Sequence, residues 1–200
     1  MINTELYVMR EKYYNYAVLK CPNQPYDTDI CPECGGVSTF RRNKILKTCF
    51  IGKKEASYYY DPMYMAHLAS PELLNLLKHA NITGFYDQKT EFIEWTDRST
   101  GKQLDLDGNK YREIIITGRG GYLTDLHGTP IPHCNKCGKI IKYGIYSYKG
   151  FSTDDWDGSD MFFLKNWPGV LIVTSKVMNL VKKNGFKSIR FLPLNEYQFV

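Results

Sequence analysis

The feature of the sequence that most constrains the fold is a pair of C-x-x-C-G segments that lie far apart in the chain. The first spans Cys31 to Gly35 and the second spans Cys134 to Gly138. Two residues between the cysteines let both thiolates bind one metal ion across a tight turn, and the glycine can adopt the positive φ with which the chain leaves that turn. About a hundred residues separate the segments, whereas a compact zinc ribbon has its second pair much sooner. A metal bound by all four sulfurs would therefore join two distant parts of the chain.

Two other uses of these cysteines stay open. A redox pair is typical of a βαβ context, whereas both segments lie among turn residues. Disulfides fit poorly with a chain that has no secretory signal and carries two further cysteines, Cys21 and Cys49. His133 precedes the second segment and can in principle replace a sulfur, although we expect it to be a surface neighbour. We expect one structural Zn²⁺ per chain, with no coordination position left for water, bound by Cys31, Cys34, Cys134 and Cys137.

Length and composition favour a globular protein. The chain has 200 residues, of which 43% are hydrophobic, enough for one substantial domain or two closely packed lobes. Its longest apolar run, Gly169 to Val173, is too short to cross a bilayer, and the first residues have neither a basic start nor an apolar segment. We therefore expect a cytoplasmic protein without a membrane partner. The net charge of +5 permits a nucleic-acid or acidic partner without requiring one.

Two segments have the signals of short amphipathic helices. Ser70 can cap a helix that has Pro71 at its first position, an apolar stripe of leucines and an end near Asn81. Ser175 can cap a second helix that ends at Gly185. Strands are predicted at 5–9, 13–19, 82–86, 91–95, 113–117, 170–173 and 189–192, and we expect the first two of these to pair with each other.

These elements predict an α+β fold of mostly antiparallel strands with two short amphipathic helices. Each predicted helix is followed by a turn and a strand, and each such unit lies on its own side of a cysteine segment. We therefore expect a single domain over residues 1–200 that is held together by zinc. It would consist of two related lobes, 1–95 and 139–200, joined by a variable segment 96–133 and by the split four-cysteine site, which resembles a zinc ribbon.

Two charged stretches are candidate binding surfaces. Residues 41–54 contain six basic side chains and no acidic one, namely Arg41, Arg42, Lys44, Lys47, Lys53 and Lys54. They indicate either a nucleic-acid surface or, as we expect, the solvated face of a strand. An acidic loop with a tryptophan at its centre indicates either a partner-binding loop or a solvated loop with the indole folded onto the core. The candidate partner-binding residues are Asp154, Asp155, Trp156, Asp157 and Asp160.

The order of these features resembles the bacterial double-CXXCG motif proteins, a family first noted as paralogues in myxobacteria and associated with immunity to polymorphic toxins. The matching parts are both cysteine segments, the helix from Ser70, the stretch from Asp160 to Phe163 and the unit from Val170 to Leu192. The segment from Asp97 to Pro132 departs from the family pattern. The resemblance implies a cytoplasmic immunity protein that binds a cognate toxin domain and blocks it without catalysis.

Two other classes of function compete with this expectation. One is a zinc-ribbon module that binds nucleic acid through residues 41–54. The other is a metal-dependent enzyme, which needs an open coordination position that four cysteines would occupy. No Ser/His/Asp or Cys/His arrangement is recognisable, and the four histidines, His67, His79, His127 and His133, have no ligand spacing. We therefore expect neither an enzyme nor a nucleic-acid partner.

Overall fold

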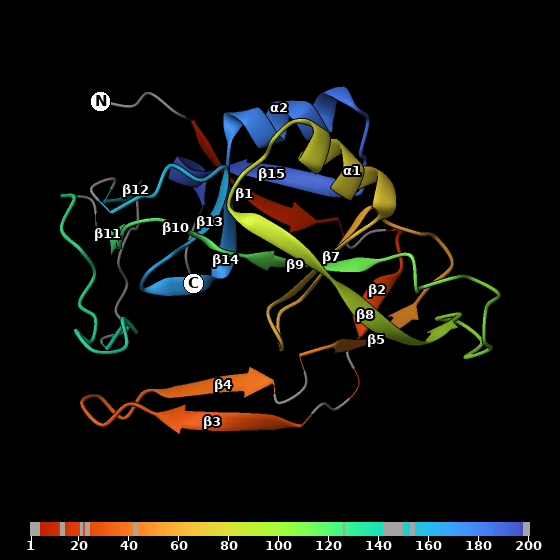
Figure 1. The fold of residues 1–200 in the computed structure, drawn as a ribbon, viewed down its shortest axis with the longest axis horizontal. Coiled ribbons are helices and arrows are strands. Elements are labelled where there is room, and N and C mark those ends of the chain that lie inside the picture. Colours follow the sequence, from red (N-terminus) through yellow and green to blue (C-terminus); the bar gives the residue numbers. More distant parts are fainter. Residues whose placement is uncertain are drawn as a thin grey trace.

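The structure, a computed structural model, describes residues 5–12, 15–20, 22, 25–41, 44–125, 127–141, 150–152 and 155–197. Within these ranges the chain forms two large β-sheets, two short two-stranded sheets and two α-helices that lie together at the top of Figure 1. The expected α+β class, with mostly antiparallel strands and two helices, is confirmed. Among the described strand pairs, β5 with β8 and β10 with β13 are parallel, and the others are antiparallel. None of the described helices is long and apolar enough to cross a membrane.

The larger sheet has six strands in the order β2-β5-β8-β9-β7-β6. Its longest strand, β8, runs without a break through the two segments that the sequence predicted as separate strands, and it pairs with β9 over Phe85–Lys89 and with β5 over Thr90–Thr96. The bounds are β2 Val18–Lys20, β5 Leu46–Ile51, β6 Tyr58–Asp61, β7 Ala66–Ala69, β8 Phe85–Thr96 and β9 Arg112–Ile116.

The second sheet has five strands in the order β10-β13-β14-β1-β15. Its bounds are β1 Leu6–Glu11, β10 Gly118–Arg119, β13 Met161–Leu164, β14 Trp167–Thr174 and β15 Ile189–Pro193, and a short 3-10 helix, Leu194–Glu196, follows. The predicted pairing of the first two strands is wrong. β1 lies between β14 and β15, where Val8 and Met9 are both buried, whereas β2 pairs with β5.

The two sheets contain the same arrangement of strands around a helix. β6 and β7 form a hairpin that leads through α1, Pro71–His79, into β8, and β9 lies between β7 and β8. β13 and β14 form a hairpin that leads through α2, Ser175–Lys183, into β15, and β1 lies between β14 and β15. The sheets do not follow the predicted lobe boundaries, because β1 belongs to the C-terminal sheet and the segment 96–133 supplies β9 and β10 to different sheets. The division into related lobes stays a prediction.

The helices begin where short polar side chains precede apolar ones, but their caps differ. In α1, Ser70 Oγ accepts a hydrogen bond from the Leu73 amide at 3.3 Å, as the sequence predicted. In α2 the cap is Thr174 rather than Ser175, and its hydroxyl donates to the carboxylate of Asp160 instead of accepting from the helix. Both helices bury apolar residues in one cluster with residues of both sheets, among them Leu73, Leu77, Val177, Val181 and Ile114.

Strands β3, Tyr26–Ile30, and β4, Val37–Arg41, form a hairpin that stands apart from the large sheets, as the lower part of Figure 1 shows. Among the described strands they pair only with each other, and every residue of β3 is exposed. The hairpin therefore contributes little to the core. A second small sheet joins β11, Leu123–Thr124, to β12, Gly150–Phe151.

Candidate metal centre

The first cysteine segment forms the tip of the β3–β4 hairpin. The Cys31 amide donates to the Gly36 carbonyl at 3.0 Å, and the Gly35 amide donates back to the Cys31 carbonyl at 2.8 Å. Gly35 has a φ of 69°, which is the left-handed conformation that the sequence predicted for the exit from this turn. The Gly36 amide also donates to Cys34 Sγ at 3.3 Å. This turn therefore holds Cys31 and Cys34 together at an exposed end of the hairpin.

The second segment repeats the same turn on a rigid support. The Cys134 amide donates to the Lys139 carbonyl at 2.8 Å, the Gly138 amide donates to the Cys134 carbonyl at 2.8 Å, and Gly138 has a φ of 73°. Ile131 and Ile140, on either side of the turn, are buried in an apolar cluster that includes Phe162 and Ile172 of the five-stranded sheet. The second turn is thus fixed to the body of the protein.

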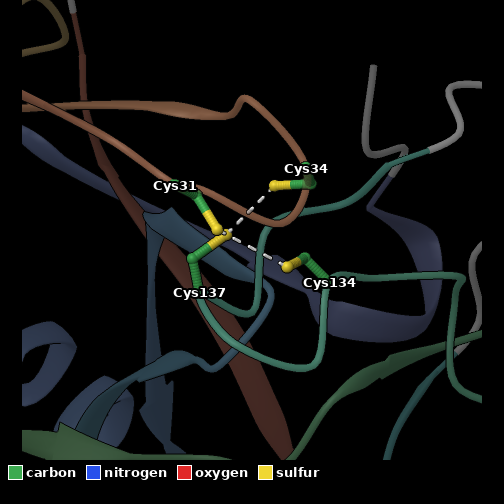
Figure 2. Close-up of side chains that lie close together, drawn as sticks. All are labelled: Cys31, Cys34, Cys134 and Cys137. Carbon is green, nitrogen blue, oxygen red and sulfur yellow. Dashed lines mark hydrogen bonds between the residues drawn. The ribbon is translucent and has the colours of Figure 1, made fainter.

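The two turns bring their four sulfur atoms together, as Figure 2 shows. Cys31 Sγ lies 3.8 Å from Cys134 Sγ, Cys34 Sγ lies 3.5 Å from Cys137 Sγ, and all four sulfurs lie within 4.8 Å of one another. Sulfurs at about 2.3 Å from one zinc ion lie about 3.8 Å apart in a regular tetrahedron. A disulfide needs about 2.05 Å between its sulfurs, so these cysteines are not disulfide-bonded. The four cysteines can hold one metal ion, as the sequence predicted.

The thiols of Cys31 and Cys34 have different pKa values. Hydrogen bonds from the amides of Cys34 and Glu33 lower the pKa of Cys31 to about 7. The amide of Gly36 favours the Cys34 thiolate, but the neighbouring sulfurs, Cys137 foremost, together with burial raise the pKa of Cys34 to about 12. Four thiolates this close repel one another, so full ionisation needs a cation among them. The arrangement thus favours a divalent metal ion.

Two charged residues beside the sulfurs did not figure in the sequence prediction. Glu33, inside the first C-x-x-C, has a carboxylate oxygen 3.7 Å from Cys134 Sγ. The Lys139 ammonium donates to the Val37 carbonyl and so ties the second turn to the start of β4. Glu33 lies within the first motif and Lys139 directly follows the second. These positions are the sequence signal that identifies the two residues.

The other candidate ligands lie apart from the cluster. His133 Nδ1 lies 2.8 Å from the Ile131 carbonyl oxygen, and its ring stacks on Tyr122 with centroids 4.1 Å apart, so it is a neighbour of the turn rather than a fourth ligand. Cys49 is a half-buried residue of β5 and is not in the cluster. Cys21 lies outside the described residues.

The predicted acidic loop divides into exposed and internal residues. Asp155 is half-exposed and forms an ion pair with Lys165 at 3.1 Å, and Trp156 packs against Phe162 with ring centroids 5.4 Å apart. Asp157 accepts hydrogen bonds from the amides of Arg119 and Ser159. Asp154 lies outside the described residues. A partner-binding role for this loop stays a prediction.

Asp160, by contrast, is buried beneath the loop. One carboxylate oxygen accepts from the Thr174 hydroxyl at 3.0 Å, and the other accepts from the Thr83 amide and from Lys176 Nζ at 2.9 Å. Burial alone would raise the pKa of Asp160, but the Lys176 ammonium and these hydrogen bonds hold it below its usual range. Asp160 therefore connects the start of α2 to the turn after α1, and it offers no exposed carboxylate to a partner.

Three of the six cations in the basic stretch have acidic partners. Arg41 pairs with Glu113 at 2.6 Å, Lys47 pairs with Glu91 at 3.5 Å, and Lys53 pairs with Asp97 at 2.8 Å. The Lys54 ammonium lies over the Tyr16 ring, 4.5 Å from its centroid. Arg42 lies outside the described residues. This pattern agrees with the expectation of a solvated strand face.

Comparison of the sequence with models of known protein families and with curated proteins found no match. The motifs and the geometry of this chain therefore carry its functional interpretation.

Proposed function

We propose that the protein is an immunity protein that binds and neutralises a cognate toxin domain, with a structural zinc ion and no catalysis of its own. The observation that supports the zinc site is the cluster of four sulfurs. Two matching turns contribute these sulfurs, which lie within 4.8 Å of one another. The toxin partner follows from the resemblance of the motif order to the double-CXXCG proteins. A binding protein of this kind needs a rigid scaffold and exposed loops rather than a reactive centre.

The donor set supports zinc in a structural role. Four sulfur ligands in a roughly tetrahedral arrangement suit zinc or iron and are unsuited to the hard cations magnesium and calcium. With four protein ligands the coordination sphere is closed, so the ion has no position for a substrate or a reactive water. The ion would instead join the exposed hairpin to the second turn, which the apolar cluster around Ile131 and Ile140 holds in place. Its contribution is therefore to stability and to the position of the hairpin.

Nucleic-acid binding through residues 41–54 is the alternative, and the ion pairs of that stretch weigh against it. Nucleic-acid affinity depends on cations that are free to replace the counterions of the phosphates. Arg41, Lys47 and Lys53 already have carboxylate partners in the protein. Their partners Glu113, Glu91 and Asp97 lie outside the stretch and offset part of its positive charge.

Two experiments test the proposal. The first is metal analysis of protein purified without added zinc, for which we expect one zinc ion per chain; four free thiols without metal, or iron in place of zinc, would contradict the zinc assignment. The second is co-expression with a candidate toxin domain taken from a gene that neighbours this one. The parent should restore growth of the producing cells and should copurify with the toxin domain, whereas killing that is unaffected by the protein would contradict the immunity function.

A further inference from the structure

A groove of about 880 Å³ separates the β3–β4 hairpin from the six-stranded sheet. The hairpin supplies one wall through Tyr26, Thr28 and Arg41. The opposite wall comes from the turn that follows β6 and from β8 and β9, and includes Met63, Met65, Tyr86 and Ile115. The hairpin contacts the rest of the protein at both of its ends, through the Arg41–Glu113 ion pair at its base and the cysteine cluster at its tip. The groove is therefore a built part of the fold.

Large apolar side chains remain exposed around this groove. Met63 is 73% exposed, Tyr26 is 53% exposed, Tyr86 is 52% exposed and Met65 is 46% exposed. A single exposed apolar side chain is ordinary, but several around one concave surface indicate a binding site. Methionine side chains are also flexible and polarisable, which suits them to apolar partners of varied shape.

The apolar surface continues along the hairpin beyond the groove. Side chains alternate along a strand, so Tyr26, Thr28 and Ile30 share one face of β3, and their partners Arg41 and Val37 in β4 share it with them. Ile30 and Val37, near the cysteine turn, are 62% and 52% exposed. Asp27 and Asp29 lie on the opposite face. The surface is thus longer than the groove itself.

The charge of the lining is positive. Arg41 and Lys44 are its charged residues, and no carboxylate is among the described residues that line it. Arg41 Nη2 donates to Glu113, but Arg41 Nη1 is buried without an acceptor in the described part of the chain. Lys44 is exposed and forms no ion pair with any described residue. A carboxylate in the groove would pair with the exposed Lys44 ammonium, and the Arg41 guanidinium of the same lining adds positive charge.

We propose that this groove binds an extended peptide segment of a protein partner, in which an acidic side chain lies between apolar ones. The acidic side chain would pair with Lys44 and Arg41, and its neighbours would pack against Tyr26, Met63 and Tyr86. Among the described strands, β3 and β4 pair only with each other, so an extended peptide can add a strand at an outer edge of the hairpin. The inference concerns a peptide site of this chain and does not depend on the identity of any toxin.

Two other occupants fit less well. A nucleic-acid strand needs a row of unpaired cations along its backbone, whereas Lys44 is the one cation of the described lining that has no carboxylate partner. A small anionic molecule would fill the groove but would leave Ile30 and Val37 exposed on the same hairpin face. An extended peptide matches the length, the apolar character and the charge together.

The experiment is a selection of random dodecapeptides displayed on phage against the folded full chain. Enriched sequences should contain an aspartate or glutamate flanked by aromatic or aliphatic residues. A synthetic copy of the most enriched peptide, labelled with fluorescein, should bind the parent, and its Kd should rise about tenfold in Lys44→Glu and in Met63→Gln. Lys187→Glu, an exposed lysine between α2 and β15, is the matched control and should change the Kd by less than about twofold.

The result that overturns the proposal is a selection without acidic and apolar enrichment, or an enriched peptide that binds Lys44→Glu and Met63→Gln as tightly as the parent. Lys44 and Met63 are both exposed, so the variants should fold, and circular dichroism with thermal melting checks this. Tyr26→Ser replaces either variant that fails to fold, with the same expected loss of affinity. A fluorescein-labelled oligodeoxythymidine that binds the parent and loses affinity in Lys44→Glu would instead make the groove a nucleic-acid site and would also overturn the proposal.

Discussion

Cys31 Sγ lies 3.8 Å from Cys134 Sγ, although the two residues are 103 positions apart in the chain. Each is the first cysteine of its turn, and each turn has the same pair of backbone hydrogen bonds. A metal ion bound between them would close a very long loop and would fix the hairpin, whose described strands pair only with each other.

Cys134→Ser should remove the metal and lower the melting temperature. A cross-link between segments about a hundred residues apart removes roughly 4–5 kcal/mol of chain entropy from the unfolded state. For a chain of this size the loss corresponds to about 10 °C or more. Differential scanning calorimetry with metal analysis measures both effects. Cys49→Ser makes the same chemical change outside the cluster and should retain the metal; equal melting temperatures for Cys134→Ser and the parent would show that the hairpin is held without the ion.

Asp160→Asn should destabilise the fold, whereas Asp155→Asn should not. Asp160 is buried, accepts hydrogen bonds from Thr83 and Thr174, and pairs with Lys176, so its neutralisation should cost about 2–3 kcal/mol. Asp155 is an exposed partner of Lys165, and its neutralisation should cost less than about 1 kcal/mol. Urea unfolding at neutral pH measures both changes. Similar costs for the two variants would refute the structural role of Asp160.

Asp155→Lys should abolish protection against the toxin if the acidic loop is the docking surface. The loop is negative and carries Trp156, and it would suit a toxin with a basic rim around its active site through charge complementarity. Asp155 is the cleanest position for this test because Asp157 accepts two backbone hydrogen bonds within the protein. Growth of cells that co-express the toxin domain is the measurement, with Trp156→Ala as a second variant.

The matched control for this charge reversal is Glu196→Lys, at an exposed residue of the 3-10 helix, which should protect fully. Each variant must first be shown to fold and to retain its metal. Full protection by both Asp155→Lys and Trp156→Ala would place the docking surface elsewhere, and the polar arm from Asp97 to Asn109 would be the next segment to mutate.

The free energy of unfolding should fall with acid from about pH 6.5 because of His67. Burial lowers the pKa of His67 to about 3, and its Nδ1 lies 2.6 Å from the Tyr58 hydroxyl. Between the unfolded pKa of about 6.5 and this value, the unfolded chain binds a proton that the folded chain excludes. Each pH unit of acidification in this window therefore removes up to about 1.4 kcal/mol from the free energy of unfolding. Above about pH 6.5 no stability is lost through His67.

His67→Gln tests this assignment by removing the titrating group while keeping a polar atom for Tyr58. The variant should be less stable than the parent at neutral pH but should lose less stability on acidification, as measured by urea unfolding between pH 7 and about 4.5. His79→Gln removes an exposed histidine and should keep the pH dependence of the parent because His67 is still present. Parallel curves for His67→Gln and the parent would assign the acid sensitivity to other groups.

The basic stretch should not bind nucleic acid at physiological salt. Lys53 has a carboxylate partner in Asp97 and Lys54 lies over Tyr16, so we expect no binding of labelled DNA or RNA at about 0.15 M salt. Fluorescence polarisation with increasing salt is the measurement. A sub-micromolar affinity that falls steeply with salt, and that is lost in the double variant Lys53→Glu and Lys54→Glu, would favour the nucleic-acid alternative.

The local features of this protein follow from short stretches of sequence. The cap of α1 depends on Ser70 and Pro71, which act within one turn of helix, and the apolar spacing predicted both helices. The positive φ of Gly35 and Gly138 follows from the motifs themselves. The four clustered cysteines were likewise identifiable as candidate metal ligands from the C-x-x-C spacing of both segments. These properties depend on contacts between residues that are close neighbours in the chain.

The tertiary structure decided the properties that depend on contacts between residues far apart in the chain. The sequence alone pairs β1 with the next strand, but β1 lies between β14 and β15, so that both of its edges pair with strands from the far end of the chain. The N-cap of α2 is likewise Thr174 rather than the predicted Ser175, and the Thr174 hydroxyl donates to the carboxylate of Asp160, 14 positions earlier in the chain. The groove beside the hairpin could not be predicted at all. Its walls come from residues between 26 and 115, and alternation within one strand shows which face is apolar but not which other segment lies opposite it.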